Sequence, residues 1–173
     1  MDVHFALPEM AEIDRLKCDA IGVPFFSDEH PPHGVLGLLD WRLCGLVTRM
    51  MMRKKISGSP LETTLVPARQ RLPVDKVLLF GAGERADLTP ELATRLMRHM
   101  LATLTQLGAR RSAVVSPGRS PVLIEPELAI ETLLSASPAF PDHDQVWVLE
   151  SLDAQRLMKP VVERERRRAR AGV

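Results

Sequence analysis

The apolar residues of this chain are grouped in short runs, which longer stretches with helical spacing separate. Residues 18–26, 77–80 and 112–116 form mostly apolar runs of strand length, which is typical of strands buried on both faces of a sheet. Residues 3–7 and 145–149 are two further candidate strands. Because strands alternate with helices, the pattern predicts an α/β domain with a mixed sheet, parallel at its centre and covered by helices on both faces.

The clearest helix of the sequence lies between Thr89 and Gly108. Thr89 can cap its start, Pro90 fits the first helical position because no N–H group is needed there, and Gly108 can end it. This helix has one continuous apolar face and should pack against the sheet. The face consists of Leu92, Leu96, Met100, Leu104 and Leu107.

Three further helices follow from the same periodicity. Residues 35–55 carry apolar side chains three and four positions apart, so we expect one helix that faces the core and ends before Gly58. Residues 128–134 form the second predicted helix. Ser151 can cap the last helix, but Pro160 lies inside it, so we expect a kink or a break into two pieces.

Residues 61–67, LETTLVP, form a β-prone run in front of the central glycine turn. Only a short connection separates this run from the strand at residues 77–80. We therefore expect the two strands to be antiparallel neighbours, either at an edge of the sheet or as a hairpin.

The composition is that of one globular domain. The chain has 173 residues, of which 45% are hydrophobic and 26% are charged. Its net charge of +1 produces no global field, so nucleic-acid binding would need a local basic patch. Tyrosine is absent and aromatic residues make up 4%, which leaves few side chains to stack on bases. Trp41 and Trp147 are expected to be core or half-buried packing residues.

No targeting or membrane signal is evident. The first residues lack a basic segment followed by a long apolar core, and no apolar run approaches the roughly 18 residues of a membrane helix. Cys18 and Cys44 both lie in apolar sequence, so we expect two buried thiols of a reducing compartment. These features predict a cytoplasmic protein without membrane contact.

Two loops that follow predicted strands are candidate binding sites for a phosphorylated ligand. Gly81-Ala82-Gly83 would let a ligand come close to free backbone amides, although a tight turn that needs positive φ is the favoured interpretation. The loop with Ser116, Gly118 and Arg119 offers hydroxyls and a cation that could hold an anion, although it is equally well interpreted as an ordinary turn. Both loops should lie at the carboxyl ends of their strands, where open α/β sheets place ligands.

A metal site and a cofactor are not expected. His30 and His33 stand beside Asp28 and Glu29, which could form a surface metal site. Ligands on one flexible loop without a buried supporting shell bind weakly, so an ordinary polar loop is favoured.

The C-terminal segment is rich in arginine. We divide the chain into a domain of residues 1–150 and a segment of residues 151–173, which holds the last helix and a basic tail. A solvated helix end is the favoured interpretation of the tail, and contact with phosphate or with a partner is the alternative. The cations of this tail are Arg164, Arg166, Arg167, Arg168 and Arg170.

The order and content of these segments resemble a known family. LLDWRLCG at residues 38–45 and LLFGAG at residues 78–83 closely resemble the amino-terminal domain of the leucyl aminopeptidases, which are hexameric two-metal peptidases. The likeness runs from about residue 18 to residue 149. The resemblance implies a macro-domain-like fold, a three-layer α/β/α sandwich around a six-stranded mixed sheet.

A weaker resemblance connects CDAIG at residues 18–22 with macro domains, which bind ADP-ribose. In a pocket of that type, the residue that matches Asp19 would accept a hydrogen bond from adenine. The loop that follows is VPFFSDEHPPHG instead of the asparagine-rich loop of nucleotide-binding relatives. The resemblance therefore does not carry this pocket over to the present chain.

The resemblance also implies that catalysis in the peptidases belongs to a larger carboxyl-terminal domain, whose signature motif does not occur in this sequence. Two metal ions need several converging carboxylates, and the scattered acids do not suggest such a cluster. We therefore expect a non-catalytic module that self-associates, or that acts as a subunit or regulator of a partner protein. The alternatives are an ADP-ribose-like or phosphorylated ligand at the strand-end loops, and weak nucleic-acid binding through the arginine tail.

Overall fold

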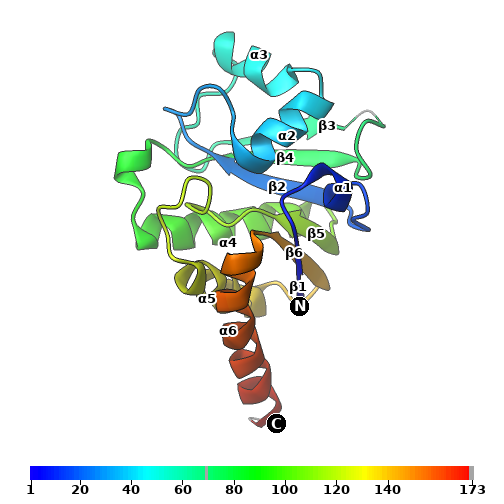
Figure 1. Cartoon of the computed structure of the whole chain (residues 1–173), viewed down its shortest axis with the longest axis vertical. Coiled ribbons are helices and arrows are strands. Elements are labelled where there is room, and N and C mark those ends of the chain that lie inside the picture. Colours follow the sequence, from blue (N-terminus) through cyan, green and yellow to red (C-terminus); the bar gives the residue numbers. More distant parts are fainter. Residues whose placement is uncertain (69, 172–173) are drawn as a thin grey trace.

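The computed structural model describes residues 1–68 and 70–171, which form a six-stranded sheet with helices on both faces (Figure 1). The strand order is β1-β6-β5-β2-β4-β3, and every neighbouring pair is parallel except β3 and β4. The predicted mixed sheet with a parallel centre and an antiparallel edge pair is confirmed. Its strands are β1 (Asp2–Ala6), β2 (Ala20–Phe25), β3 (Thr63–Pro67), β4 (Lys76–Gly81), β5 (Arg111–Val114) and β6 (Gln145–Leu149).

The helices divide into two groups, and each group covers one hydrophobic cluster. One cluster unites one face of the sheet with α4, α5 and α6, and the other unites the opposite face with α1, α2 and α3. This is the expected three-layer α/β/α arrangement. The helices are α1 (Met10–Ile13), α2 (Gly34–Arg42), α3 (Leu46–Met52), α4 (Pro90–Gln106), α5 (Pro126–Ala136) and α6 (Leu152–Ala171), with short 3-10 turns at Arg85–Asp87 and Ser137–Ala139.

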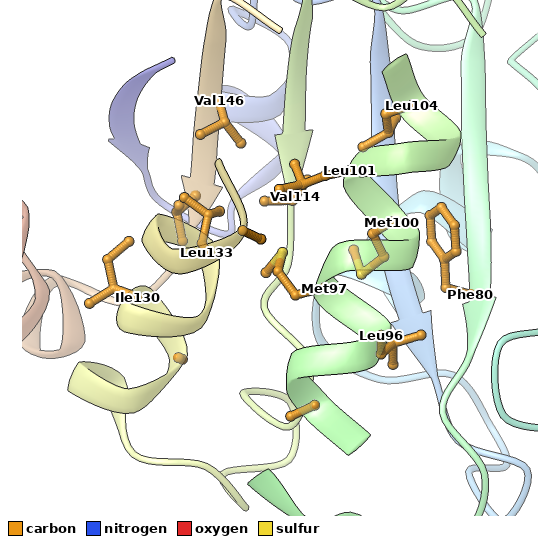
Figure 2. Close-up of a cluster of buried hydrophobic side chains, with 14 of the residues drawn as sticks. Phe80, Leu96, Met97, Met100, Leu101, Leu104, Val114, Ile130, Leu133 and Val146 are labelled. Carbon is orange, nitrogen blue, oxygen red and sulfur yellow. The ribbon is translucent and has the colours of Figure 1, made fainter. Parts of the chain in front are cut away.

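Helix α4 forms the centre of the larger cluster (Figure 2). Leu96, Met97 and Met100 are completely buried against the sheet and α5. Full burial of each such side chain contributes about 1.5 to 3 kcal/mol of hydrophobic stabilisation. Thr89 Oγ1 accepts a hydrogen bond from the amide of Leu92 at 3.2 Å, which confirms the predicted cap.

The predicted helix over residues 35–55 is wrong in one respect, because the structure divides it into α2 and α3. Cys44 and Gly45 have φ angles of 57° and 73°, and these left-handed residues end the first helix. The buried carboxylate of Asp40 then accepts hydrogen bonds from the amides of Val47 at 2.7 Å and Thr48 at 3.2 Å. Asp40 therefore caps the start of α3 from within the preceding helix.

This break also corrects the expectation for one of the two cysteines. Cys44 lies in the turn between the helices and is exposed, whereas Cys18 is buried as predicted. Burial raises the pKa of the Cys18 thiol to about 12. Only Cys44 is therefore placed to react with a reagent in solution.

Helix α6 continues through Pro160, so the break, one of the two alternatives expected from the sequence, does not occur. Proline removes the hydrogen bond to the carbonyl of Arg156, but both residues are exposed, so water can satisfy that carbonyl. Met158 and Val162 pack in the same cluster as α4, while residues 163–171 are exposed. The first half of α6 is therefore an integral part of the domain core, and only the second half projects from it (Figure 1).

The two tryptophans differ in their environments. Trp147 is half-buried and stacks on the ring of His4 at a centroid distance of 5.1 Å, as expected of a packing residue. The expectation for Trp41 is wrong, because 71% of this residue is exposed at the end of α2. In the part of the chain that the structure describes, no helix combines the length and the apolar character needed to cross a membrane.

Two loops approach each other closely at the end of β4, so adding a single methyl group at Gly81 should lower the stability of the fold substantially. A Cβ atom on Gly81 would lie 2.0 Å from the carbonyl oxygen of Ser59, so Gly81→Ala should lower the free energy of unfolding by about 3 kcal/mol. Gly108 has a φ of +76° and open space around it, so Gly108→Ala should cost only about 1 kcal/mol from backbone strain. Urea unfolding of both variants measures the difference, and equal losses would contradict the steric explanation.

Candidate functional site

The candidate ligand site lies at the carboxyl ends of the central parallel strands. Strands β2, β4 and β5 run in the same direction, so the loops that follow them meet at one edge of the sheet. The Gly81-Ala82-Gly83 turn follows β4, and the loop of residues 116–124 follows β5. The structure therefore brings these two predicted loops to the same edge, which is where open α/β sheets bind ligands.

The Gly81-Ala82-Gly83 turn has no free amides to offer a ligand. All three backbone N–H groups donate hydrogen bonds within the protein, and Gly83 has the positive φ of a tight turn, +80°. The turn thus holds the chain segment in front of β3 against the ends of β2 and β4, and the amide cradle considered from the sequence does not form. The acceptors are the carbonyl oxygens of Glu62, Phe25 and Gly58, each at 2.8 Å.

The loop after β5 differs from the glycine turn, because several of its backbone amides have no hydrogen-bond acceptor within residues 1–68 and 70–171. The amides of Ser116, Gly118, Ser120 and Val122 meet no acceptor among the described residues. The hydroxyl of Ser116 is buried and likewise has no partner in the described part of the chain. These amides alternate with two prolines and with the bonded amide of Arg119, so they offer single donors to an anion and no continuous row of N–H groups. This loop therefore retains the polar groups that a phosphate could use.

Arg119, the predicted cation of this loop, is already engaged by the protein. Its Nε donates to the Glu150 carboxylate at 2.7 Å, and its Nη1 donates to the carbonyl of Ile124 at 2.7 Å. Glu150 also accepts the amide of Ser151 at 2.9 Å, and both members of the ion pair are buried. The pair fixes the loop after β5 to the junction between β6 and α6.

Little space is left between these loops. The cavities beside Ser120 have volumes of about 10 Å³ and about 140 Å³. A Cβ atom on Gly34, at the start of α2, would lie 2.5 Å from Ser120 Oγ, so the loops after β2 and β5 touch. Pockets for cofactor-sized ligands have volumes of roughly 300–1,000 Å³. The closed edge is therefore too small for a ligand of that size unless the loops move apart.

Asp19 lies at the opposite edge of the sheet, in front of β2. Its carboxylate accepts the amides of Arg110 at 3.0 Å and Arg111 at 2.9 Å, and a guanidinium N–H of Arg111 at 3.1 Å. Partial burial raises the pKa of Asp19, but these hydrogen bonds outweigh it and hold that pKa below its usual value. The structure therefore does not bring Asp19 together with the other predicted ligand-binding residues.

His143 at the same edge of the sheet is buried. Its Nε2 lies 2.8 Å from the hydroxyl of Ser112. Burial disfavours the imidazolium and holds the pKa of His143 below its usual value. Its Nδ1 lies 3.4 Å from the hydroxyl of Thr105, so His143 connects α4 with β5 just in front of β6, which is a packing role.

The arginine tail is exposed, and most of its charge is paired. Arg166 also donates a hydrogen bond to the carbonyl of Val3 at 3.1 Å, which covers part of the free edge of β1. No ion pair of Arg170 is seen within residues 1–68 and 70–171. The ion pairs of the tail are Arg164 with Glu131, Arg166 with Asp2, Arg167 with Glu163 and Arg168 with Glu165.

A larger, mostly apolar groove of about 430 Å³ lies between the loop after β2 and helix α3, and the sequence interpretation missed it. His30 lines this groove, and His33 Nδ1 lies 3.7 Å from the buried Glu29. Within the described residues, no three acidic, histidine or cysteine side chains converge as a metal site would require. The signal in the sequence was the run Met50-Met51-Met52, because three consecutive helical residues cannot all face the core. The groove is lined by His30, Pro31, Pro32, Thr48, Met51 and Met52.

Comparison with known families identifies one match. Residues 23–140 match the N-terminal domain of the cytosol aminopeptidase family. A probable cytosol aminopeptidase of a Geobacter species is 31% identical over 156 residues, which cover 87% of this chain and 30% of that relative. A probable cytosol aminopeptidase of Alkaliphilus oremlandii is 24% identical over 107 residues, which cover 62% of this chain and 21% of that relative. The chain thus spans less than a third of the length of these relatives.

Solved structures share the fold at low sequence identity. The Trypanosoma brucei macrodomain in complex with ADP-ribose aligns with a TM-score of 0.72 and 16% identity, over 92% of this chain and 68% of that chain. A mutant of tomato leucine aminopeptidase aligns with a TM-score of 0.62 and 15% identity, over 93% of this chain and 35% of that chain. The macrodomain of Mycobacterium tuberculosis DarG has a TM-score of 0.67 at 15% identity and covers 86% of this chain and 98% of that chain. These likenesses establish a macrodomain-like fold.

The buried ion pair at the closed edge generates a stability prediction. Arg119→Met should lower the free energy of unfolding by about 3 to 5 kcal/mol, because it leaves the Glu150 carboxylate buried without its partner. The double variant Arg119→Met/Glu150→Gln removes the isolated charge and should recover much of that loss. Urea unfolding measures both values. A single variant as stable as the unmodified chain would show that the pair does not hold the two loops together.

Proposed function

Because the chain belongs to the family of the cytosol aminopeptidase N-terminal domain, we propose that it is a non-catalytic binding module that associates with another protein chain. The partner is a second copy of this chain, or a chain to which it contributes as a subunit or regulator. The matched relatives contain more than two thirds of their length beyond the region of likeness, so a chain that carries such a part is one natural partner.

Exposed apolar side chains at the ends of α2 and α3 carry this proposal. Trp41 is 71% exposed and Met52 is 78% exposed, and the 430 Å³ groove adjoins Met52. Tryptophan and methionine are enriched in the cores of protein interfaces and depleted on the remaining surface. The edge at which open α/β sheets place small ligands is by contrast filled by Arg119, Glu150 and the contact between two loops. The exposed apolar side chains and the filled edge of the sheet both favour a macromolecular partner over a cofactor-sized ligand.

Sedimentation velocity tests the proposal. The purified chain should form a larger species at micromolar concentration, either alone or when mixed with a cytosol aminopeptidase of the same source organism. Met52→Ala should weaken that association by about tenfold or more, because it removes an exposed apolar side chain that lines the groove.

Leu107→Ala is the matched control, since Leu107 is 40% exposed at the distant end of α4 and should leave association unchanged. A chain that stays monomeric in both samples would overturn the proposal.

A second candidate function is binding of a phosphorylated ligand by the loop of residues 116–124. The free amides and the unpartnered hydroxyl of Ser116 support it, as does the likeness to a macrodomain solved with ADP-ribose. Glu125 and Glu127 follow the loop and would repel an anion, and the cavities are small. Nucleic-acid binding by the arginine tail has less support, because most of its cations are already paired.

Calorimetry with ADP-ribose and with inorganic phosphate tests the second function. If the loop binds the phosphate group, both compounds should release heat, and Ser116→Ala should weaken binding by about fivefold through loss of one hydrogen bond. Because the hydroxyl of Ser116 has no partner, the same change should leave the unfolding temperature nearly unchanged. Absence of heat at millimolar ligand would remove this function.

A further inference from the structure

The groove beside α3 has unbalanced positive charge at its end. Arg53, Lys54 and Lys55 directly follow the groove residue Met52, and all three are exposed. None of them forms an ion pair with the part of the chain that the structure describes. The groove therefore has a mostly apolar lining, and these three cations follow it directly in the chain. Together these features suit a segment that carries apolar and acidic side chains.

The chain itself contains such a segment in residues 122–128, VLIEPEL. Val122 is 70% exposed and Leu123 is 44% exposed, although both are large apolar residues. Glu125 and Glu127 are also exposed, and neither has a basic partner among the described ion pairs. The segment thus presents two apolar side chains followed by two unpaired carboxylates.

The segment is held in one conformation before any partner arrives. The amide of Leu123 donates to the carbonyl of Gly118 at 2.7 Å, and Ile124 is buried. Pro126 is buried at the first turn of α5, which fixes the other end. A preorganised segment loses little conformational entropy when it docks.

Groove and segment belong to neighbouring loops. The groove residues Pro31 and Pro32 precede Gly34, and the space beside Gly34 is filled by Ser120, two residues before Val122. Two complementary patches that adjoin on one molecule can each meet the other across a two-fold axis, which gives a closed dimer. A head-to-tail contact, in which the groove of each copy takes the segment of the next copy, would instead generate a ring or an open filament.

We infer that the groove between residues 30–32 and α3 takes residues 122–128 of a second copy of this chain, with Arg53, Lys54 and Lys55 facing Glu125 and Glu127. The inference rests on the proposed function and names both the partner and the contact surface. Val122 and Leu123 enter the apolar part of the groove beside Met52. The charged end fixes the register of the segment and makes the dimer sensitive to salt.

Reciprocal charge reversal tests this dimer by sedimentation velocity. The groove variant Lys54→Glu/Lys55→Glu and the segment variant Glu125→Lys/Glu127→Lys should each weaken self-association by about tenfold or more, because like charges then face one another. An equal mixture of the two variants should dimerise as tightly as the unmodified chain. In the mixed dimer, each reversed groove meets a reversed segment, and each original groove meets an original segment.

Two controls separate this contact from general charge effects. The tail variant Arg167→Glu/Arg168→Glu should leave dimerisation unchanged, since the tail takes no part in the contact. Met52→Ser should weaken the dimer without reducing its dependence on salt, because it removes only an apolar contact. All of the substituted positions are exposed, so the variants should unfold at nearly the same temperature as the unmodified chain.

Failure of the inference and failure of the proposed function give different results. A chain that is monomeric alone but sediments with a cytosol aminopeptidase would overturn the self-pairing and leave the proposed function standing. Dimerisation that neither charge reversal affects, or that mixing does not restore, would overturn this contact surface. A chain that associates with neither partner would overturn both.

Discussion

Burial of the central strands on both faces is the constraint on which the rest of this structure depends. All six residues of β2 and the last five of β4 are inaccessible to water, so helices must cover both sides of the sheet. The connecting loops are thereby confined to the two edges at which the strands begin and end. Because β2, β4 and β5 are parallel, three loops share one edge, and only their side chains decide whether that edge is an open pocket.

In this chain the side chains close the edge. The buried pair of Arg119 and Glu150 links the loop after β5 to the end of β6, and Ser120 packs against Gly34 from the loop after β2. A buried ion pair adds little net stability over an apolar replacement, but it is costly to break on one side only. The pair therefore serves mainly to fix two loops in one arrangement. The fold is shared with a macrodomain solved in complex with ADP-ribose, but the cavities beside Ser120 are smaller than a ligand of that size requires.

The sequence was sufficient for the elements whose signals are local. The face and cap of α4, the parallel centre and the antiparallel edge pair follow from apolar spacing, from Thr89 and from short connections. The sequence was insufficient where contacts between residues far apart in the chain determine the local structure. The carboxylate of Asp40 reaches across a turn to start α3, and the amides at Gly81 are occupied by a segment about twenty residues away. Periodicity also assigned the methionine run to a core helix, because spacing alone does not show that Met52 lies beyond the covered face.

Charge, too, has to be judged from local pairing and not from the overall composition, and this pairing decides where on the molecule a charged partner can bind. A net charge of +1 conceals two basic segments of opposite character. The tail arginines alternate with glutamates at helical spacing, so their charges are largely paired along α6 and against neighbouring elements. The cations after α3 have no acids at such spacing, and their field stays directed to solvent beside an apolar groove. The cations of residues 53–55 can therefore attract an acidic surface more strongly than the longer arginine tail, because ion pairs within the protein already neutralise most of the tail's charge.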